Sequence, residues 1–362
     1  MPDEWQSVRR VLAVRLDNIG DVVLLGPALR TIKQQLPDAS LTLLASPAGT
    51  QVVPLLPWVD DVITRRVPWQ EIESAGVPDV ERERELVEVL RERHFDAALI
   101  FTSFSQSPYP PAYVCYLAGI PIRLGQSKEF GGNVLSQWVK PRPDDLHQAE
   151  RNLHLLEQAG FDVWDRHLEL HVPDDAQEAA DRMLGRAGIN PFSPFILLAP
   201  GASCEARRYD PYRYAVVASG LAAETQLPIV VVGSEREHEL CQPILSNHAV
   251  KQVVSLVGQT SIPELAGIIR RTVLVIANDS GPMHLADAFA RPMVILYSGT
   301  EYESQWRPRK APTVLLRRST ACSPCYAFHC PYDMECLDIP PEEVIDIAVA
   351  QLVERTMSEE RV

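Results

Sequence analysis

The residues with the clearest capacity for chemistry lie together in one short segment, and they are Asp279, Ser280, Gly281 and His284. The apolar run Val273–Ala277 leads into this segment and a helical pattern, Met283–Ala290, follows it, which predicts a strand–turn–helix junction. Such a turn leaves free N–H groups at a helix N-terminus, where the helix dipole favours an anion. The carboxyl ends of strands are also where open α/β sheets bind ligands. The alternative is an ordinary turn with a helix cap and a surface histidine.

A second junction of this kind follows the apolar run Phe195–Ala199. It contains a glycine turn at Gly201, a hydroxyl at Ser203 and two adjacent arginines, Arg207 and Arg208. Arginine binds phosphate oxygens in a bidentate manner, and hydroxyl and backbone N–H groups add neutral donors, so the segment is suited to a diphosphate. Adjacent side chains point in different directions, and we therefore expect only one arginine to contact the ligand. The alternative is a solvated basic loop.

An aspartate follows the first predicted strand, Val11–Leu16. Gly20 permits a tight turn there, and Asp21 falls at the start of the next helix. A carboxylate in this position can accept a proton from a hydroxyl nucleophile. It can equally cap the helix through backbone N–H groups. The turn has neither a G-x-G-x-x-G nor a Walker sequence, so it is not a standard dinucleotide or P-loop site.

A further acidic position follows the predicted strand Ile229–Val232. An acid just beyond a strand of a nucleotide-binding domain commonly accepts hydrogen bonds from ribose hydroxyls. Glu235 is the nearer candidate and Glu237 is the alternative. Either acid is explained equally well by its favourable interaction with the helix dipole.

Four of the seven cysteines cluster near the C-terminus, at Cys322, Cys325, Cys330 and Cys336, with His329 beside them. Thiolates at this density can hold zinc or an iron–sulfur cluster. The spacing matches no standard zinc pattern, however, so we expect free thiols or disulfides. A structural metal on the four cysteines is the alternative.

Composition bounds the class of protein. The chain has 362 residues and a formal net charge of −14, which argues against non-specific nucleic-acid binding. No apolar run approaches the roughly 20 residues that span a bilayer. We therefore expect a cytoplasmic protein, with at most peripheral contact at the inner face of the cytoplasmic membrane.

Short apolar runs alternate with amphipathic helical patterns along nearly the whole chain, which predicts parallel sheets covered by helices on both faces. The predicted strands are Val11–Leu16, Leu41–Ala45, Asp61–Thr64, Ala97–Phe101, Ile122–Leu124, His167–Val172, Phe195–Ala199, Ile229–Val232, Val253–Leu256, Val273–Ala277 and Val294–Tyr297. The predicted helices are Val22–Leu36, Glu81–Arg93, Ala112–Ala118, His147–Gln158, Asp175–Ala187, Tyr212–Glu224, Glu235–Ser246, Pro263–Arg271, Met283–Ala290 and a terminal helix after Pro340.

Prolines interrupt this pattern between Lys140 and Asp175, and we place a domain boundary near residue 173. The predicted fold is α/β, with two Rossmann-like domains, 1–173 and 174–362, facing across a cleft.

These motifs together resemble those of glycosyltransferase family 9, the heptosyltransferases of the lipopolysaccharide core. The segment from Asp279 to His284 resembles the turn that binds the donor's diphosphate and sugar in the family, and Arg207 and Ser203 match its phosphate-binding residues. Asp21, next to Gly20 on the acceptor side, is similar to the family's catalytic base, and Glu235 is similar to its ribose-binding acid. Arg207 stands where characterised members of the family often have lysine; we expect the phosphate contact to survive this change, and donor preference is the property left open to it.

The resemblance implies a GT-B fold with an N-terminal acceptor domain and a C-terminal donor domain. It also implies metal-independent, inverting transfer of a heptose or related sugar from a nucleotide-diphosphate donor, expected to be ADP-heptose, to a glycan or glycolipid hydroxyl, without a cofactor. The loops Thr102–Pro111 and Lys128–Gln137 are expected to select the acceptor. The alternatives are a GT-B-type sugar-nucleotide epimerase and a non-catalytic sugar-nucleotide-binding module.

Overall fold

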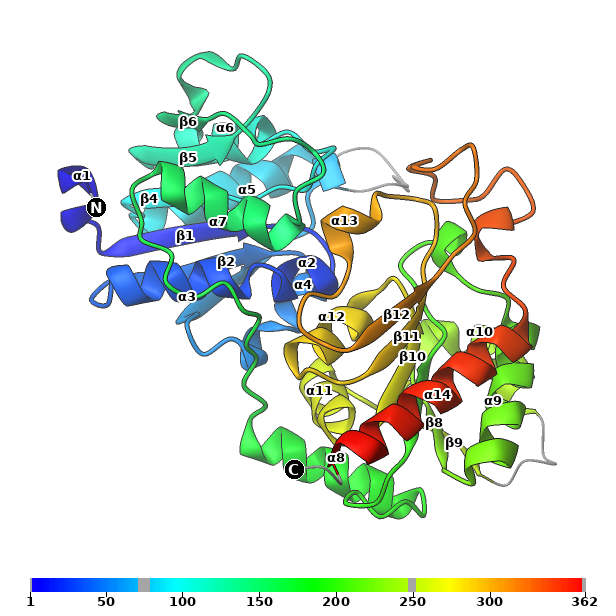
Figure 1. Cartoon of the computed structure of the whole chain (residues 1–362). Helices are drawn as coiled ribbons and strands as arrows, with labels where there is room; N and C mark the ends of the chain where they lie inside the picture. Colours follow the sequence, from blue (N-terminus) through cyan, green and yellow to red (C-terminus); the bar gives the residue numbers. More distant parts are fainter. Residues whose placement is uncertain (1, 71–78, 247–251, 360–362) are drawn as a thin grey trace. The chain divides into compact units, whose positions relative to one another are not determined.

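The computed structural model describes residues 2–70, 79–246 and 252–359. The chain divides into two compact units, Met1–His171 and Val172–Val362. Each unit is built on one parallel sheet of six strands with helices packed against it (Figure 1). The α/β class predicted from the alternating pattern is therefore confirmed.

In the first unit the strand order is β3-β2-β1-β4-β5-β6. The strands are β1 (Arg10–Arg15), β2 (Ser40–Ala45), β3 (Asp61–Thr64), β4 (Ala97–Ile100), β5 (Ile122–Gln126) and β6 (Gln137–Val139). The helices are α1 (Asp3–Gln6), α2 (Ile19–Val23), α3 (Gly26–Gln35), α4 (Pro47–Thr50), α5 (Val80–Glu92), α6 (Tyr109–Leu117) and α7 (Gln148–Gln158). The central strands are apolar and buried, as expected for a sheet covered on both faces.

In the second unit the strand order is β12-β11-β10-β7-β8-β9. The strands are β7 (Ile196–Ala199), β8 (Ile229–Val231), β9 (Val253–Ser255), β10 (Leu274–Asn278), β11 (Met293–Leu296) and β12 (Thr313–Leu316). The helices are α8 (Asp174–Arg186), α9 (Pro211–Thr225), α10 (His238–Leu245), α11 (Ile262–Arg271), α12 (Gly281–Ala288), α13 (Glu303–Trp306) and α14 (Pro341–Glu359), with the 3₁₀ helices η4 (Glu205–Arg207) and η5 (Glu235–Glu237) between them.

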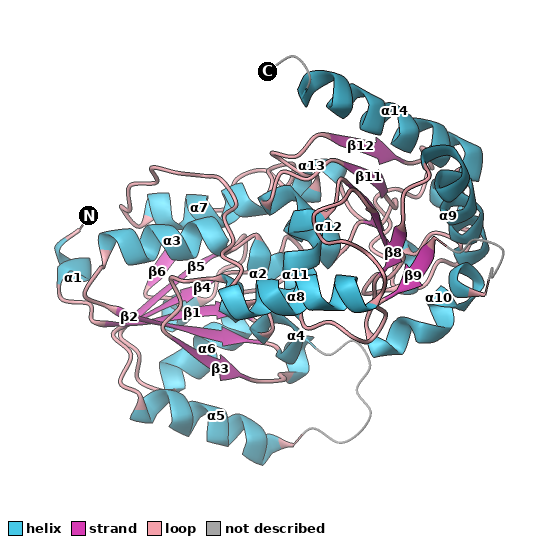
Figure 2. Cartoon of the chain, turned by 90° about the horizontal axis from the view of Figure 1, so that it is seen from below, coloured by secondary structure: helices cyan, strands magenta, loops and turns pink. Residues whose placement is uncertain are grey.

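Two helix pairs of the second unit pack closely because a glycine lies at each contact. The terminal helix α14 runs beside α9, and a Cβ atom added to Gly220 would lie 2.4 Å from Ile345 Cδ1 (Figure 1). Helix α8 lies against α11, where a Cβ atom on Gly267 would lie 2.9 Å from the Cβ atom of Ala180 (Figure 2). The C-terminal helix is thereby held against α9, and it also contacts β11 of the same unit.

Two predicted elements differ from the structure, and two of its strands were not predicted. The helix predicted over Val22–Leu36 is two helices, α2 and α3, because Pro27 lies in the first turn of α3 and cannot continue a preceding helix. The polar strand predicted over His167–Val172 is wrong: this segment is not a strand, and β3 and β6 are the outer strands of the sheet of its unit. Strands β6 and β12 were not predicted, because both are short and only partly buried.

The strand order places β1 beside β4 and β7 beside β10 at the centre of the two sheets. In each sheet the chain proceeds outward in one direction from one strand of the central pair and in the opposite direction from the other strand. In such sheets a crevice forms at the carboxyl ends of these two strands. This is where open parallel sheets bind ligands. None of the described helices is long and apolar enough to cross a membrane.

Candidate functional site

At the crevice of the first unit, a buried arginine holds two aspartates. The side chain of Arg15, at the end of β1, is fully buried. Its Nε atom lies 3.0 Å from Asp17 Oδ2, and its Nη2 atom lies 2.6 Å from Asp21 Oδ1. Both aspartates are on the segment that connects β1 to α2, so the guanidinium fixes that segment to the end of the strand.

Asp21 is both a helix cap and a candidate base. Its Oδ2 atom accepts a hydrogen bond of 3.1 Å from the Asn18 N–H in a reciprocal capping box. Its Oδ1 atom accepts from Arg15 and, at 3.3 Å, from the Ser103 hydroxyl. A carboxylate has about four acceptor positions, so these three contacts leave capacity for a further proton. The helix-cap alternative is thus part of the structure without excluding a chemical role.

The second strand of the pair is followed by two side chains that the sequence analysis named only as part of the loop Thr102–Pro111. Ser103 and Gln106 follow β4; Gln106 Nε2 donates to Asp17 Oδ1, and Ser103 Oγ accepts a hydrogen bond of 2.8 Å from Arg15. Burial raises the pKa of Asp17 to about 6. The Arg15 guanidinium opposes this rise only in part, and the Asp21 carboxylate raises the pKa further. Arg15 could have been noticed as a charged residue inside an apolar strand, whereas nothing in the sequence links Ser103 or Gln106 to it.

At the crevice of the second unit, Arg207 lies in a chain of hydrogen bonds. Its Nε atom donates to Thr300 Oγ1 at 3.1 Å, and its Nη2 atom lies 2.8 Å from Glu301 Oε2. Thr300 Oγ1 lies 2.9 Å from Ser298 Oγ, which donates to Asp279 Oδ2 at 3.1 Å. Burial lowers the pKa of Arg207, but the carboxylates of Asp279 and Glu301 outweigh it and raise the pKa overall. The predicted residues Arg207 and Asp279 are therefore joined through two hydroxyls.

Asp279 is almost fully buried, with 5% of its surface exposed. Its Oδ1 atom has no hydrogen-bond partner among the described residues. Burial raises the pKa of this carboxyl to about 7, against the opposing effects of Arg207 and the Ser298 hydroxyl. The carboxyl is thus poised between its neutral and charged forms near neutral pH.

The two arginines have different roles, as expected for adjacent side chains. Arg208 donates from Nε and Nη2 to the Ala202 carbonyl oxygen, at 3.2 and 3.0 Å. It therefore fastens the turn after β7. Ser203 is exposed on the same turn, and Arg207 is the arginine that belongs to the network of charged groups.

A buried asparagine, missed in the sequence analysis, joins the two strands of this crevice. The Nδ2 atom of Asn278 donates to the Pro200 carbonyl at 2.7 Å, and its Oδ1 atom accepts from the Tyr209 N–H and the Tyr214 hydroxyl, both at 3.2 Å. The turns that follow β7 and β10 are thereby held in a fixed relation.

Of the two acids after β8, Glu237 lies at the turn after β7. A Cβ atom on Gly201 would lie 1.8 Å from Glu237 Oε1, so the glycine is needed for the close approach of this carboxylate. Glu237 Oε2 accepts from the Ser234 N–H at 2.7 Å. Glu235 is exposed and approaches Gly258 instead.

The turn after β10 forms the N-terminus of α12. Ser280 is the N-cap residue, but its side chain makes no capping bond, and its hydroxyl lies 3.4 Å from the Asn278 carbonyl oxygen. Gly281 begins the helix. His284 is buried, with its ring 6.4 Å from that of Trp306, so the alternative of a surface histidine is wrong.

Comparison with known proteins decides the family. The sequence profile of glycosyltransferase family 9 (heptosyltransferase) matches residues 83–335. The chain belongs to glycosyltransferase family 9. It is therefore a glycosyltransferase, which favours the predicted enzyme over the epimerase and the non-catalytic module.

Relatives and solved structures agree with this family. Lipopolysaccharide heptosyltransferase 3 of Escherichia coli K12 is 24% identical over 296 residues, covering 80% of this chain and 82% of the relative. The structure of the E. coli ADP-heptose lipopolysaccharide heptosyltransferase II has a TM-score of 0.75 at 22% identity and covers 96% of this chain and 99% of that one. The E. coli heptosyltransferase WaaC with ADP-2-deoxy-2-fluoro heptose has a TM-score of 0.64 at 17% identity, with 96% and 99% coverage. The GT-B fold of two Rossmann-like units is confirmed.

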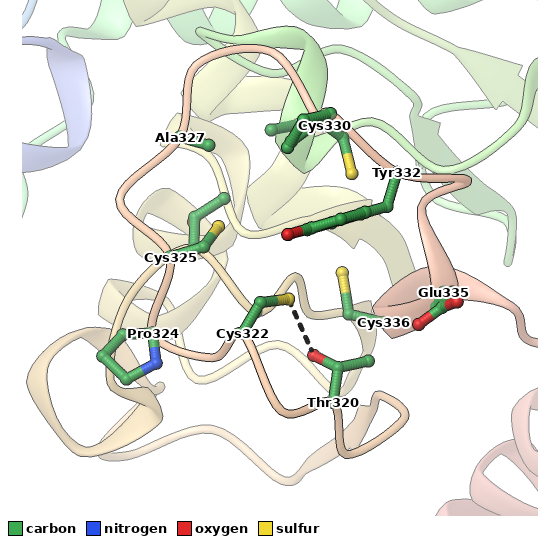
Figure 3. Close-up of a pocket in the computed structure, with 13 residues that line it drawn as sticks. Thr320, Cys322, Pro324, Cys325, Ala327, Cys330, Tyr332, Glu335 and Cys336 are labelled. Atoms are coloured by element: carbon green, nitrogen blue, oxygen red, sulfur yellow. Dashed lines mark hydrogen bonds between the residues drawn. The ribbon is translucent and has the colours of Figure 1, made fainter.

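The cysteine cluster of this glycosyltransferase lines a pocket of about 360 Å³ in the second unit. Figure 3 shows the four sulfur atoms around the ring of Tyr332, which points into the pocket. All four cysteines are free thiols. Among the described residues, no group of three or more His, Cys, Asp or Glu side chains is placed to hold a metal ion.

The cysteine loop, the segment 322–336 that carries the four cysteines, forms backbone hydrogen bonds with the residues around Arg207. The Cys325 and Tyr326 N–H groups donate to the carbonyls of Gly299 and Thr300, at 3.1 and 2.8 Å. The Ala206 N–H donates to the Phe328 carbonyl at 3.0 Å. The loop therefore packs on both segments that carry the Arg207 network.

Proposed function

We propose that this enzyme transfers a heptose from ADP-heptose to a hydroxyl group of a lipopolysaccharide-core-like acceptor, with inversion at the anomeric carbon and without a metal ion. The observation that carries the proposal is the arrangement at the two central strand pairs. A buried Arg15 holds a carboxylate, Asp21, in the first unit, and Arg207 lies with Asp279 at the switch point of the second. The relatives are named as lipopolysaccharide heptosyltransferases, and one solved structure contains an ADP-heptose analogue.

The first unit would bind the acceptor and supply the base. Asp21 accepts the proton of the acceptor hydroxyl. At the same time the oxygen of that hydroxyl attacks the anomeric carbon from the face opposite the nucleotide. A new carbon–oxygen bond forms, the bond to the diphosphate breaks, and ADP leaves with the electron pair. Arg15 and Ser103 orient the Asp21 carboxylate for this step.

The second unit would bind the donor. As the leaving diphosphate gains negative charge, Arg207 and the N-terminus of α12 stabilise it, with the Gly201 turn supplying backbone N–H groups. Asp279, Ser280 and His284 are assigned to the donor's sugar and diphosphate. Glu235 is assigned to the ribose, and Glu237 is the alternative because it lies against Gly201.

The assignment is tested by measuring transfer from several nucleotide sugars to lipopolysaccharide cores of defined length. We expect ADP release from ADP-heptose only when a core that lacks the next heptose is present. A preference for a uridine or guanosine donor would overturn the choice of donor. Release of ADP without any acceptor dependence would overturn the choice of reaction.

A further inference from the structure

The cysteine loop carries a chemistry that the proposed transfer reaction does not use. Its four thiols line one pocket of about 360 Å³, and Gly299 and Thr300 line the same pocket. Thr300 Oγ1 accepts the 3.1 Å hydrogen bond from Arg207 Nε. A chemical change at the thiols therefore acts on a segment that holds the arginine assigned to the donor.

Two of the thiols, those of Cys322 and Cys336, lie on segments that pack on the same glycine. A Cβ atom added to Gly299 would lie 3.2 Å from the Cβ atom of Ser323 and 3.3 Å from that of Cys336. Because Cys322 precedes Ser323 in the chain, the two ends of the cysteine loop meet at this glycine. In Figure 3 the sulfur atom of Cys322 points toward Cys336. A disulfide requires Cα atoms about 4.4–6.8 Å apart, so a small movement of the loop can join these two segments.

The other two thiols of the loop are less suited to pair with Cys336. Figure 3 shows the ring of Tyr332 between the sulfur atoms of Cys330 and Cys336. The same view places Cys325 on the other side of the pocket from Cys336. Cys322 is therefore the thiol that is best placed to pair with Cys336.

The two thiols differ in how readily they react. Cys322 is exposed, so a small oxidant in solution reaches it. Cys336 is half-buried, and burial raises the pKa of its thiol, which favours the unreactive protonated form. Cys322 should therefore react first, and Cys336 should react second, when the two sulfur atoms are held close together.

We propose that Cys322 and Cys336 form a reversible disulfide by exchange with a small disulfide such as oxidised glutathione, and that this modification weakens donor binding. The Cys322 thiolate attacks one sulfur atom of the small disulfide, which forms a mixed disulfide and releases one glutathione thiolate. Cys336 then loses its proton, attacks the sulfur atom of Cys322 and releases the second glutathione. The two cysteines lose two electrons and two protons, and the small disulfide gains them to become two thiols.

Formation of this disulfide would reach Arg207 through the backbone. The Tyr326 N–H group donates to the Thr300 carbonyl oxygen at 2.8 Å. The Phe328 carbonyl oxygen accepts from the Ala206 N–H group at 3.0 Å. A movement of the loop is therefore passed to both segments that position Arg207. We expect donor binding about 3- to 10-fold weaker after oxidation, the scale of one lost hydrogen bond, and this consequence rests on the proposed donor site.

Mass spectrometry of the protein after incubation with oxidised glutathione tests the modification. We expect the intact protein to lose two hydrogen atoms and to regain them in a reductant. Cleavage after the aromatic residues Tyr326, Phe328 and Tyr332 separates Cys336 from Cys330 and from the peptide that contains the other two cysteines. The expected linked pair is this peptide with that of Cys336.

Cys322→Ser and Cys325→Ser are matched variants, because both replace an exposed cysteine of the same loop. The disulfide should form in Cys325→Ser as it does in the wild type, and it should not form in Cys322→Ser. A disulfide that is lost in Cys325→Ser, one that contains Cys330, or a wild-type protein that keeps all its thiols would overturn the proposal.

Titration of the reduced and oxidised proteins with ADP-2-deoxy-2-fluoro heptose tests the consequence for the donor. The wild type and Cys325→Ser should bind this probe more weakly when oxidised and should recover in a reductant, whereas Cys322→Ser should bind it equally in both states. Equal affinity of the reduced and disulfide-bonded wild type would overturn the proposed effect on the donor site.

Failure of the proposed function gives a different result. If the reduced wild type does not bind the probe at all, the proposed donor is wrong, and the mass spectra still decide whether the disulfide forms. Thermal unfolding of each variant in a reductant establishes that the compared proteins are folded.

Discussion

Arg207→Ala, with Arg208→Ala as its matched control, tests which arginine binds the donor. The two residues are adjacent, but their side chains have different partners. Arg207 contacts Thr300 and Glu301, whereas Arg208 contacts the Ala202 carbonyl. We therefore expect Arg207→Ala to weaken donor binding and slow transfer, and Arg208→Ala to do little to either.

The magnitude follows from the contacts that change. A charge-assisted hydrogen bond to phosphate contributes about 1.5–3 kcal/mol, which corresponds to about 10- to 150-fold in Kd. The same substitution leaves Glu301, only 19% exposed, without its arginine beside the diphosphate, which adds repulsion. The double variant Arg207→Ala/Glu301→Gln should therefore recover part of the lost affinity. For Arg208→Ala, a change within about 0.5 kcal/mol, or about twofold, is expected.

The assay is titration of the four proteins with ADP and with ADP-2-deoxy-2-fluoro heptose, together with thermal unfolding. A modest fall in Tm with unchanged Kd is expected for Arg208→Ala, because its guanidinium fastens a turn. A larger loss of affinity in Arg208→Ala than in Arg207→Ala would refute the reasoning. Failure of Glu301→Gln to recover any affinity in the double variant would refute the role assigned to repulsion.

Three further predictions concern the base, the metal and the buried acid. Asp21→Asn should lower kcat by about 10²–10⁴-fold while donor Kd stays nearly constant; transfer at the wild-type rate would remove Asp21 from the mechanism. Transfer should persist in EDTA, because Arg207 and the N-terminus of α12 are the groups proposed to neutralise the leaving diphosphate; loss on chelation, with recovery in magnesium, would contradict metal independence. Because the pKa of Asp279 is raised to about 7, the stability it contributes is complete below about pH 4 and is lost as the pH rises through 7. The difference in Tm between Asp279→Asn and the wild type should therefore be more favourable to the variant at about pH 8 than at about pH 5. An equal difference at both pH values would contradict the raised pKa of Asp279.

Much of the fold was predictable because its signals are local. Strand β3 was predicted with its observed bounds, and β4, β7 and β10 were each predicted within one residue at both ends. Strands β4, β7 and β10 are short, apolar and buried, which makes their signal in the sequence clear. The break between α2 and α3 also had a local signal, Pro27, but the apolar pattern continues across it and by itself predicts one helix.

The site was less predictable because its partners are distant in sequence. Asp21 is six residues from Arg15, but Ser103 reaches it only because β4 pairs with β1. In the same way Arg207 meets Glu301 and Thr300 across more than ninety residues of chain. A strand order can be inferred from a family resemblance, but which side chains project at the ends of those strands is set by packing in three dimensions.

The central claim is that Asp21 and Arg207 serve one reaction, the transfer of a heptosyl group from ADP to an acceptor hydroxyl. The most direct test is to quantify ADP and heptosylated acceptor together in single-turnover reactions of the wild type, Asp21→Asn and Arg207→Ala. The account predicts equal amounts of both products in the wild type, product formation about 10²–10⁴-fold slower in donor-saturated Asp21→Asn, and product from Arg207→Ala that increases with donor concentration. ADP formed without heptosylated acceptor in the wild type, or product formed by Asp21→Asn at the wild-type rate, would contradict it.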